Sequence, residues 1–270
     1  MLKKVYQEIT PPLIQSWVKN IVHKKRGHFS GPYAKWHDGL QVAAGYDDMA
    51  ILERVKQATL QVKNNRNLYV RDGVVFSTAQ YPFPLFSALL KIAFENHGKL
   101  NIIDFGGGLG SSFYAFNHFC PEIQLQWQII EQRNFVACGQ QYFVEKGLSF
   151  YQYLHEISTS VDVILLSGCL QYLEDPYATL DKIQAIQSKY VILDRTWFDK
   201  SAQTDKIVIE HVPEHIYSGS YPCWVFSLAK MQAYFKKHYQ ILFEFDALEG
   251  QMVSNGLHIS SKGFFLGKQL

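Results

Sequence analysis

The chain has 270 residues, of which 47% are hydrophobic, so it can bury one large core and does not have the composition of a disordered protein. Its 26 basic and 24 acidic residues give a net charge of +2, which argues against a nucleic-acid partner held by overall charge. The four cysteines contain no C-x-x-C pair, and no uncharged stretch approaches the ~20 residues of a membrane helix. We therefore expect a cytoplasmic protein with a small-molecule substrate, no nucleic-acid partner and no membrane span.

The first hundred residues read as mainly helical. Apolar residues recur at helical spacing over 11–22, and an irregular aromatic segment over 28–39 follows. A second helix is predicted after Asp47, a turn over 69–76 and a third helix over 82–96. We interpret residues 1–98 as a helical cap packed on the carboxyl edge of the sheet that comes next.

From residue 99 onward, strand and helix patterns alternate. The predicted strands are 100–105, 125–131, 148–153, 161–167 and 190–194, separated by helices that begin near Ser111, Phe135 and Pro176. Such alternation predicts an α/β fold with a doubly wound, Rossmann-like parallel sheet and right-handed crossovers.

The rhythm changes after Arg195. Residues 199–226 read as an inserted hairpin or lid, and a helix over 228–237 leads into strands over 239–245 and 263–267. The connection between the last two strands is too short for a crossover helix, so this pair is predicted to be antiparallel. Residues 99–270 would then form one domain with a seven-stranded sheet whose last strand is reversed.

The glycine-rich stretch after the first predicted sheet strand is the best clue to function. Asp104, Gly106, Gly108 and Gly110 fill every place of the pattern D-x-G-x-G-x-G, whereas Ser111 stands where a dinucleotide fingerprint needs Gly or Ala. In this motif and in the reversed last strand, the chain resembles the class I S-adenosylmethionine-dependent methyltransferases. The resemblance implies S-adenosylmethionine as cofactor, with Asp104 and the turn from Gly106 through Gly107 to Gly110 facing its methionine moiety.

An acid closes the second predicted sheet strand. Glu131 stands where a carboxylate accepts hydrogen bonds from ribose hydroxyls, both in methyltransferases and in nicotinamide-dependent dehydrogenases. Its neighbour Gln132 is a further candidate for the cofactor. The loop after the fourth strand resembles the one where cofactor and acceptor meet in small-molecule methyltransferases, and it adds Gln171 for the cofactor and Tyr172 for the substrate.

Methyl transfer asks the protein to align an acceptor with the methyl group and, for a hydroxyl or amine, to remove a proton. The candidate bases are His211 and Asp72, although for each of them alone a structural role is the favoured interpretation. The ten histidines form no H-x-x-H or H-E-x-x-H group, so no metal is expected.

A narrower resemblance covers nearly the whole chain. It rests on Phe29-x-Gly31-x-Tyr33-x-x-Trp36, Gly45-Tyr46-Asp47, Arg71-Asp72, the glycine motif, Trp127-x-Ile129-Ile130-Glu131-Gln132 and Tyr217-x-x-x-Tyr221-Pro222-x-Trp224. These stretches resemble a bacterial methyltransferase family associated with surface-polysaccharide biosynthesis. The resemblance implies a saccharide or sugar-nucleotide acceptor and adds Tyr33, Trp36, Tyr217 and Tyr221 as substrate residues.

Two alternatives stay open at this stage. One is an NAD(P)-dependent oxidoreductase, against which Ser111 and the reversed last strand count. The other is a cofactor-binding protein without catalysis, because no single base is compelling. The sequence leaves the acceptor, the methylated atom and the oligomeric state open.

Overall fold

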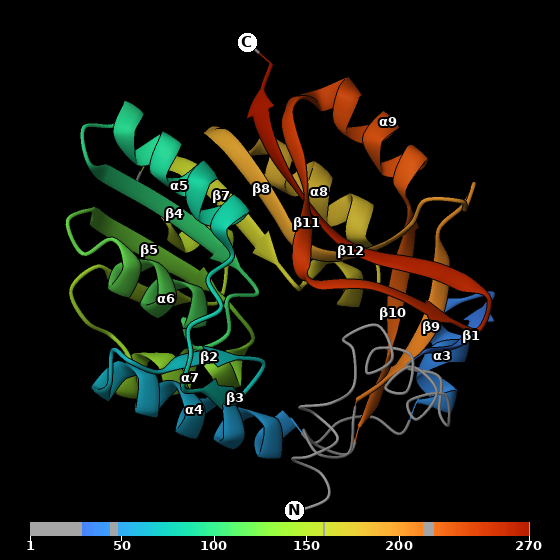
Figure 1. The fold of residues 1–270 in the computed structure, drawn as a ribbon, viewed down its shortest axis with the longest axis horizontal. Coiled ribbons are helices and arrows are strands. Elements are labelled where there is room, and N and C mark those ends of the chain that lie inside the picture. The colour runs from blue at the N-terminus through green and yellow to red at the C-terminus, as the bar shows by residue number, and fades with distance from the viewer. Residues whose placement is uncertain (1–28, 44–47, 159, 213–218, 270) are drawn as a thin grey trace, which may run out of the picture.

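A central sheet carries helices on both faces (Figure 1). The computed structural model describes residues 29–43, 48–158, 160–212 and 219–269. The helix predicted over 11–22, the proposed helix cap Asp47 and the substrate candidate Tyr217 lie outside these residues.

Within the described chain the large sheet has ten strands, and seven of them form its central part. They are β4 (Lys99–Phe105), β5 (Gln124–Ile130), β6 (Leu148–Tyr151), β7 (Val161–Ser167), β8 (Ser188–Asp199), β11 (Tyr239–Ser254) and β12 (Leu257–Lys268). Strands β6-β5-β4-β7-β8 pair in parallel in that order. Strand β12 then pairs antiparallel with both β8 and β11. The predicted fold is confirmed: this is a doubly wound, Rossmann-like α/β sheet with its last strand reversed.

The last two strands are longer than predicted. Strand β11 runs on to Ser254 and β12 begins at Leu257, and the two-residue turn Asn255-Gly256 joins them. Both turn residues have positive φ, which is the backbone that a tight antiparallel hairpin needs. The prediction stopped short because the residues between 246 and 262 are largely polar and include no apolar run comparable to 263–267.

Helices cover the two faces of the sheet. In the described chain they are α3 (Trp36–Val42), α4 (Asp48–Asn64), α5 (Phe83–Glu95), α6 (Ser111–Phe119), α7 (Arg133–Tyr142), α8 (Pro176–Ala185) and α9 (Leu228–His238), with single 3-10 turns η2 (Leu154–Glu156) and η3 (Leu170–Tyr172). Helices α4 to α7 share one buried core, and α8 and α9 share another.

The two cores follow from the period of a strand. Ile102 of β4 faces the core of α5 and α6, whereas the next residue, Ile103, faces the core of α8 and α9. Both faces are therefore apolar, as expected for a parallel sheet covered on both sides. Helix α5, which the sequence placed in the cap, packs against β4 and β8 and belongs to the same layer as α6.

The segment predicted as a turn over 69–76 is a small hairpin. Strands β2 (Tyr69–Arg71) and β3 (Val74–Phe76) pair antiparallel around Asp72-Gly73. Both turn residues again have positive φ, so Asp72-Gly73 supplies the turn geometry that a two-residue hairpin requires.

A second, smaller group of strands projects beyond the end of β7. Strands β9 (Lys206–His211) and β10 (Ser220–Ser227) form an antiparallel hairpin in the segment predicted as an insertion, and β1 (Phe29–Tyr33) pairs antiparallel with β9. We call β1, β9 and β10 the arm. Strand β10 joins the end of β8 in parallel, so the arm continues the main sheet (Figure 1).

The arm has two faces of different character. Its inner face packs on a third core, and it carries Val208, Glu210, Tyr221, Cys223 and Val225. Its outer face, covered by α3, carries Ile207, Ile209, His211, Pro222 and Trp224. Helix α3 lies close because Gly39 fits against Ile209 and Pro222.

No helix among the described residues is long and apolar enough to cross a bilayer.

Candidate functional site

The glycine turn joins β4 to α6 and depends on close approach by other segments. At Gly106, where φ is +73°, an added Cβ would lie 2.6 Å from the Cβ of Cys169. At Gly107 an added Cβ would lie 2.5 Å from the carboxylate of Asp104. At Gly108 it would meet no described atom within 4 Å, so this residue faces open space. The turn is therefore packed tightly on its inner side and accessible on its outer side.

Asp104 lies beneath the turn. Its side chain is 1% exposed, and it accepts a hydrogen bond of 2.9 Å from Nε1 of Trp127. Burial raises the pKa of Asp104 to about 7, although the bond from Trp127 opposes the shift. The sequence placed Asp104 toward the cofactor, and the structure gives it contacts with Gly107 and Trp127 that order the turn.

Glu131 reaches the turn from the neighbouring strand. It follows the end of β5, and its carboxylate accepts hydrogen bonds from the backbone N–H of Gly108 at 3.3 Å and of Gln132 at 2.7 Å. Burial raises the pKa of Glu131, and these two bonds oppose the rise. The structure therefore brings Glu131 and the glycine turn together, whereas the side chain of Gln132 is exposed at the start of α7.

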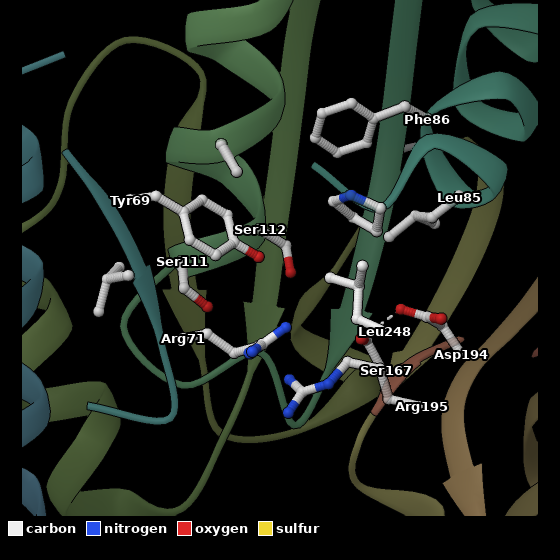
Figure 2. A pocket seen from close by; sticks show the side chains of 13 residues that line it. Tyr69, Arg71, Leu85, Phe86, Ser111, Ser112, Ser167, Asp194, Arg195 and Leu248 are labelled. Carbon is white, nitrogen blue, oxygen red and sulfur yellow. Dashed lines mark hydrogen bonds between the residues drawn. The ribbon is translucent and has the colours of Figure 1, made fainter. Parts of the chain in front are cut away.

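A pocket opens beside the turn, at the start of α6 (Figure 2). Ser111 and Ser112 contribute from the start of α6, Ser167 and Asp194 from the ends of β7 and β8, and Arg71 from the hairpin. Figure 2 shows the guanidinium groups of Arg71 and Arg195 close together at one side of this space. The pocket thus lies at the carboxyl ends of the strands, where open α/β sheets bind ligands.

Arg71 lines this pocket, although the sequence singles it out only as part of the Arg71-Asp72 stretch and not as a site residue. Its Nη1 is buried and has no hydrogen-bond partner among the described residues, while Nη2 donates to Gln80 at 3.3 Å. A buried guanidinium nitrogen with unused hydrogens is suited to an anionic ligand group. The sequence signal for Arg71 is its position just before Asp72-Gly73, the two turn residues of a tight hairpin. The sequence predicts only a turn over 69–76, so this signal does not stand out.

Asp194 adds a carboxylate to the pocket. It is 1% exposed and accepts a hydrogen bond of 2.9 Å from the hydroxyl of Ser167. Burial raises the pKa of Asp194 to about 6, and the charge of Arg195 opposes that shift. The pocket therefore presents a cationic group and a carboxylate to the same space.

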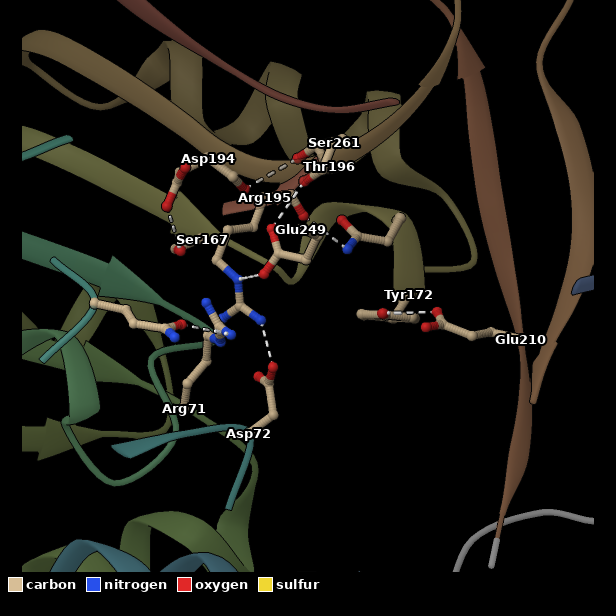
Figure 3. A network of polar contacts seen from close by, with 12 residues as sticks. Arg71, Asp72, Ser167, Tyr172, Asp194, Arg195, Thr196, Glu210, Glu249 and Ser261 are labelled. Atoms are coloured by element: carbon tan, nitrogen blue, oxygen red, sulfur yellow. Dashed lines mark hydrogen bonds and ion pairs between the residues drawn. The ribbon is translucent and has the colours of Figure 1, made fainter. Parts of the chain in front are cut away.

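Asp72, a predicted base, is a partner of Arg195. Nη2 of Arg195 donates to Asp72 at 2.5 Å, and Nε donates to Glu249 of β11 at 2.5 Å (Figure 3). Although burial opposes it, the carboxylates of Asp72 and Glu249 raise the pKa of Arg195. The structure thus assigns Asp72 to an ion-pair network that ties the hairpin turn to β8 and β11.

The loop after β7 packs on the glycine turn. The thiol of Cys169 donates to the carbonyl of Phe105 at 3.0 Å. Gln171 is 2% exposed, and its Nε2 donates to the carbonyl of Arg195 at 3.0 Å. The Oε1 atom of Gln171 is buried and has no hydrogen-bond partner in the described part of the chain. This loop therefore links the turn to the end of β8.

Tyr172, at the end of η3, meets the inner face of the arm. Its hydroxyl donates to Glu210 at 2.9 Å, and its ring packs edge-on against Tyr221 with centroids 5.1 Å apart. Burial raises the pKa of Tyr172, and the charge of Glu210 adds to the rise. Two predicted substrate residues, Tyr172 and Tyr221, therefore come together around Glu210, which the sequence did not select.

His211, the other predicted base, faces the opposite way. Its Nε2 lies 2.8 Å from the hydroxyl of Ser30, and its side chain is exposed. Successive residues of a strand point to opposite faces, so His211 and Glu210 cannot both face Tyr172. Trp36 stacks on Trp224 at 6.0 Å on this outer face, and Tyr33 ends β1 half-buried. The structure therefore does not place His211 or Trp36 with Tyr172.

Among the described residues, no group of three or more His, Cys, Asp and Glu side chains is arranged to hold a metal ion.

No protein-family model matches the chain, and no curated protein matches it. Solved structures do. The N-terminal domain of EvdMO1, crystallised in the presence of S-adenosylhomocysteine (SAH) and D-fucose, is 16% identical, with 84% of this chain and 98% of that chain covered and a TM-score of 0.47. The 1,6-didemethyltoxoflavin-N1-methyltransferase of Burkholderia thailandensis was crystallised with 1,6-didemethyltoxoflavin and SAH. It is 14% identical, with 88% of this chain and 93% of that chain covered and a TM-score of 0.43. An S-adenosylmethionine-dependent methyltransferase of Methanosarcina mazei is 11% identical, with 66% of this chain and 97% of that chain covered and a TM-score of 0.44.

Proposed function

We propose that the protein is an S-adenosylmethionine-dependent methyltransferase that transfers a methyl group to a hydroxyl or amine of a small molecule. The observation that carries the proposal is the contact between Glu131 and Gly108, 3.3 Å apart, at the carboxyl edge of a class I methyltransferase sheet. It joins a strand-end carboxylate to an accessible glycine turn, which is an arrangement suited to the ribose of a nucleoside ligand.

The residues around the turn fit the chemical groups of this cofactor. Glu131 would accept hydrogen bonds from the ribose hydroxyls. Arg71, with its buried and unpartnered Nη1, would bind the carboxylate of the methionine moiety, assisted by the free N–H groups at the start of α6. Asp194 would face the ammonium group. A zwitterion thus finds both of its charges matched within one pocket.

When bound, S-adenosylmethionine supplies a methyl carbon that is electrophilic because it is attached to a sulfonium. The chain has three tasks: to orient the acceptor, to keep water from the reacting atoms and to take up the proton of a hydroxyl or amine. The narrower sequence resemblance supports a saccharide or sugar-nucleotide acceptor of polysaccharide biosynthesis. We include that acceptor class in the proposal.

Isothermal titration calorimetry with SAH tests the cofactor. We expect binding at micromolar strength, and we expect the change Glu131→Gln to weaken it by about 10–100-fold, because hydrogen bonds to a charged group are worth about 1.5–3 kcal/mol. Glu122→Gln, at an exposed acid away from the turn, is the matched control and should bind like the wild type. NADH is the control ligand and should not bind. Absence of SAH binding by the wild-type protein would refute the proposal.

A further inference from the structure

The inner face of the arm holds a buried carboxylate. Glu210 is 7% exposed, accepts the hydrogen bond of 2.9 Å from Tyr172 and lies beside Cys223, whose thiol pKa is raised by burial and then by the charge of Glu210. Removing a carboxylate from water costs free energy even when hydrogen bonds are provided. A glutamate in this position, between Phe29 of β1 and Tyr221 of β10, is therefore a costly choice for packing alone.

This carboxylate is connected to the glycine turn through one short loop. Cys169 packs against Gly106 of the turn and donates a hydrogen bond to Phe105 at the end of β4, and Tyr172 follows it at the end of η3. The hydroxyl of Tyr172 then reaches Glu210. Figure 3 shows Tyr172 and Glu210 as a pair set apart from the Arg71–Arg195 network, with Tyr172 projecting from the loop and Glu210 from the facing strand. The pair therefore lies on the arm side of the carboxyl edge.

Two buried polar atoms, one on the residue before Tyr172 and one in the third core, have no hydrogen-bond partner in the described part of the chain. Oε1 of Gln171, the residue before Tyr172, is an acceptor, and Nε1 of Trp197, in the third core on which Tyr172 packs, is a donor. Their side chains are 2% and 5% exposed, and neither atom has a hydrogen-bond partner among the described residues. Buried polar atoms are nearly always satisfied, so an unpaired donor and an unpaired acceptor in one region favour a polar ligand there.

We propose that Glu210 is the proton acceptor for the methyl acceptor, and that Tyr172 holds its carboxylate in place. The proposal rests on the methyltransferase function proposed above, and it commits to a polar small molecule with a hydroxyl or amine. In the step, the acceptor's O–H or N–H proton passes to Glu210 as the acceptor's lone pair forms the new bond to the methyl carbon. The carbon–sulfur bond breaks and its electron pair stays on sulfur. Glu210 later releases the proton to water.

Substitutions can separate this role from a structural one. Glu210→Gln keeps an oxygen that accepts the hydrogen bond from Tyr172 but removes the ability to take a proton at neutral pH. Glu210→Asp keeps the carboxylate and shortens its reach. His211→Gln is the matched control, because His211 follows Glu210 in β9, lies on the outer face and is hydrogen-bonded to Ser30.

The test measures methyl transfer without a known acceptor. Protein is incubated with S-adenosylmethionine carrying a radioactive methyl group and a deproteinised small-molecule extract of the source cells, and label in the small-molecule fraction is counted. SAH binding is measured in parallel by calorimetry. We expect Glu210→Gln to lose at least about 100-fold of the labelling rate, in line with the loss of a positioned base, and to bind SAH within about twofold of the wild type. His211→Gln should label normally, and Glu210→Asp should retain partial labelling.

Each other outcome counts against the proposal. Labelling by Glu210→Gln at the wild-type rate would overturn it, and so would loss of SAH binding together with labelling, because that result indicates a structural role. If Glu210→Gln does not fold, the test rests on Glu210→Asp. Should Glu210→Asp fold and transfer label as fast as His211→Gln, the proposal would be contradicted. If the wild type binds SAH but labels nothing, the acceptor class and this role fail while cofactor binding stands. If the wild type does not bind SAH, the proposed function itself fails.

Discussion

The glycine turn and the arm reach the same edge of the sheet by different routes. The turn is one contiguous stretch, and its contacts with Asp104 and Glu131 come from its own strand and the adjacent one. The arm joins the hairpin of β9 and β10 to β1, a strand that lies far earlier in the chain, where Phe29 pairs with Glu210. The contact between the turn and Glu131 is therefore set by local backbone geometry, whereas the contacts of Tyr172 on the arm are set by strand register and by which face each residue takes.

The largest expected loss of stability follows from a substitution in the glycine turn. Gly106→Ala should destabilise the protein by about 2–5 kcal/mol, from about 1–2 kcal/mol for a left-handed backbone and about 1–3 kcal/mol for overpacking against Cys169. Gly98→Ala is the control, because Gly98 also has positive φ, +82°, but an added Cβ meets no described atom within 4 Å. Urea denaturation measures both. Equal losses in the two variants would show that close approach at Gly106 contributes nothing.

The same contrast explains what the sequence could predict. Strand β4, the glycine turn and Glu131 could be predicted because each has a signal in the sequence. These signals are an apolar run, a glycine spacing and an acid at the end of a strand, and all of them lie within about thirty residues. The strand order followed from the alternation of strands and helices and from the short final connection. These are local signals, and the structure places Glu131 against Gly108 as they indicate.

Arg71 and Glu210 were not predictable in the same way. Arg71 belongs to the pocket only because its hairpin folds over the ends of β7 and β8. In the sequence, His211 attracts attention as a base because histidine titrates near neutral pH, and a one-residue shift along β9 exchanges the two faces. Which of the two points inward depends on the pairing of β9 with β10, where Glu210 stands opposite Tyr221.

A pH measurement sharpens the description of the turn. The pKa of Asp104 is raised from 3.8 to about 7 by burial, so between about pH 4 and pH 7 the folded state keeps a proton that the unfolded state has released. Stability contributed by this group should therefore fall as pH rises through that window, by an amount on the order of 2–4 kcal/mol at about 1.4 kcal/mol per pKa unit. Asp104→Asn removes the titration and keeps an oxygen for the bond from Trp127.

The comparison to make is between unfolding free energies of wild type and Asp104→Asn at several pH values. We expect the wild type to lose stability relative to the variant as pH rises from about 4 to 7, and we expect SAH binding by the variant to persist at acidic pH. Glu122→Gln should run parallel to the wild type throughout. Parallel curves for Asp104→Asn would mean that this carboxyl group ionises as freely in the folded protein as in the unfolded chain.

The smallest expected effect concerns the ion pair between Asp72 of the hairpin turn and Arg195 of β8. Asp72 is 58% exposed and pairs with Arg195, which keeps a second partner in Glu249. Asp72→Asn should therefore cost only about 0.5–1 kcal/mol in urea denaturation, and about 1 M salt should remove most of the difference. Glu53→Gln, which breaks the exposed pair with Lys56 on α4, is the control for a salt-screened surface pair.

Asp72→Asn also decides between two proton acceptors in the labelling assay. With Glu210 as the base, the variant should transfer label at close to the wild-type rate, because Asp72 is engaged with Arg195 and Tyr172 is bonded to Glu210. A loss of labelling as large as that expected for Glu210→Gln, with stability and SAH binding retained, would return the role to Asp72. The proton would then leave on the Arg195 side of the edge, and the buried carboxylate of the arm would need another explanation.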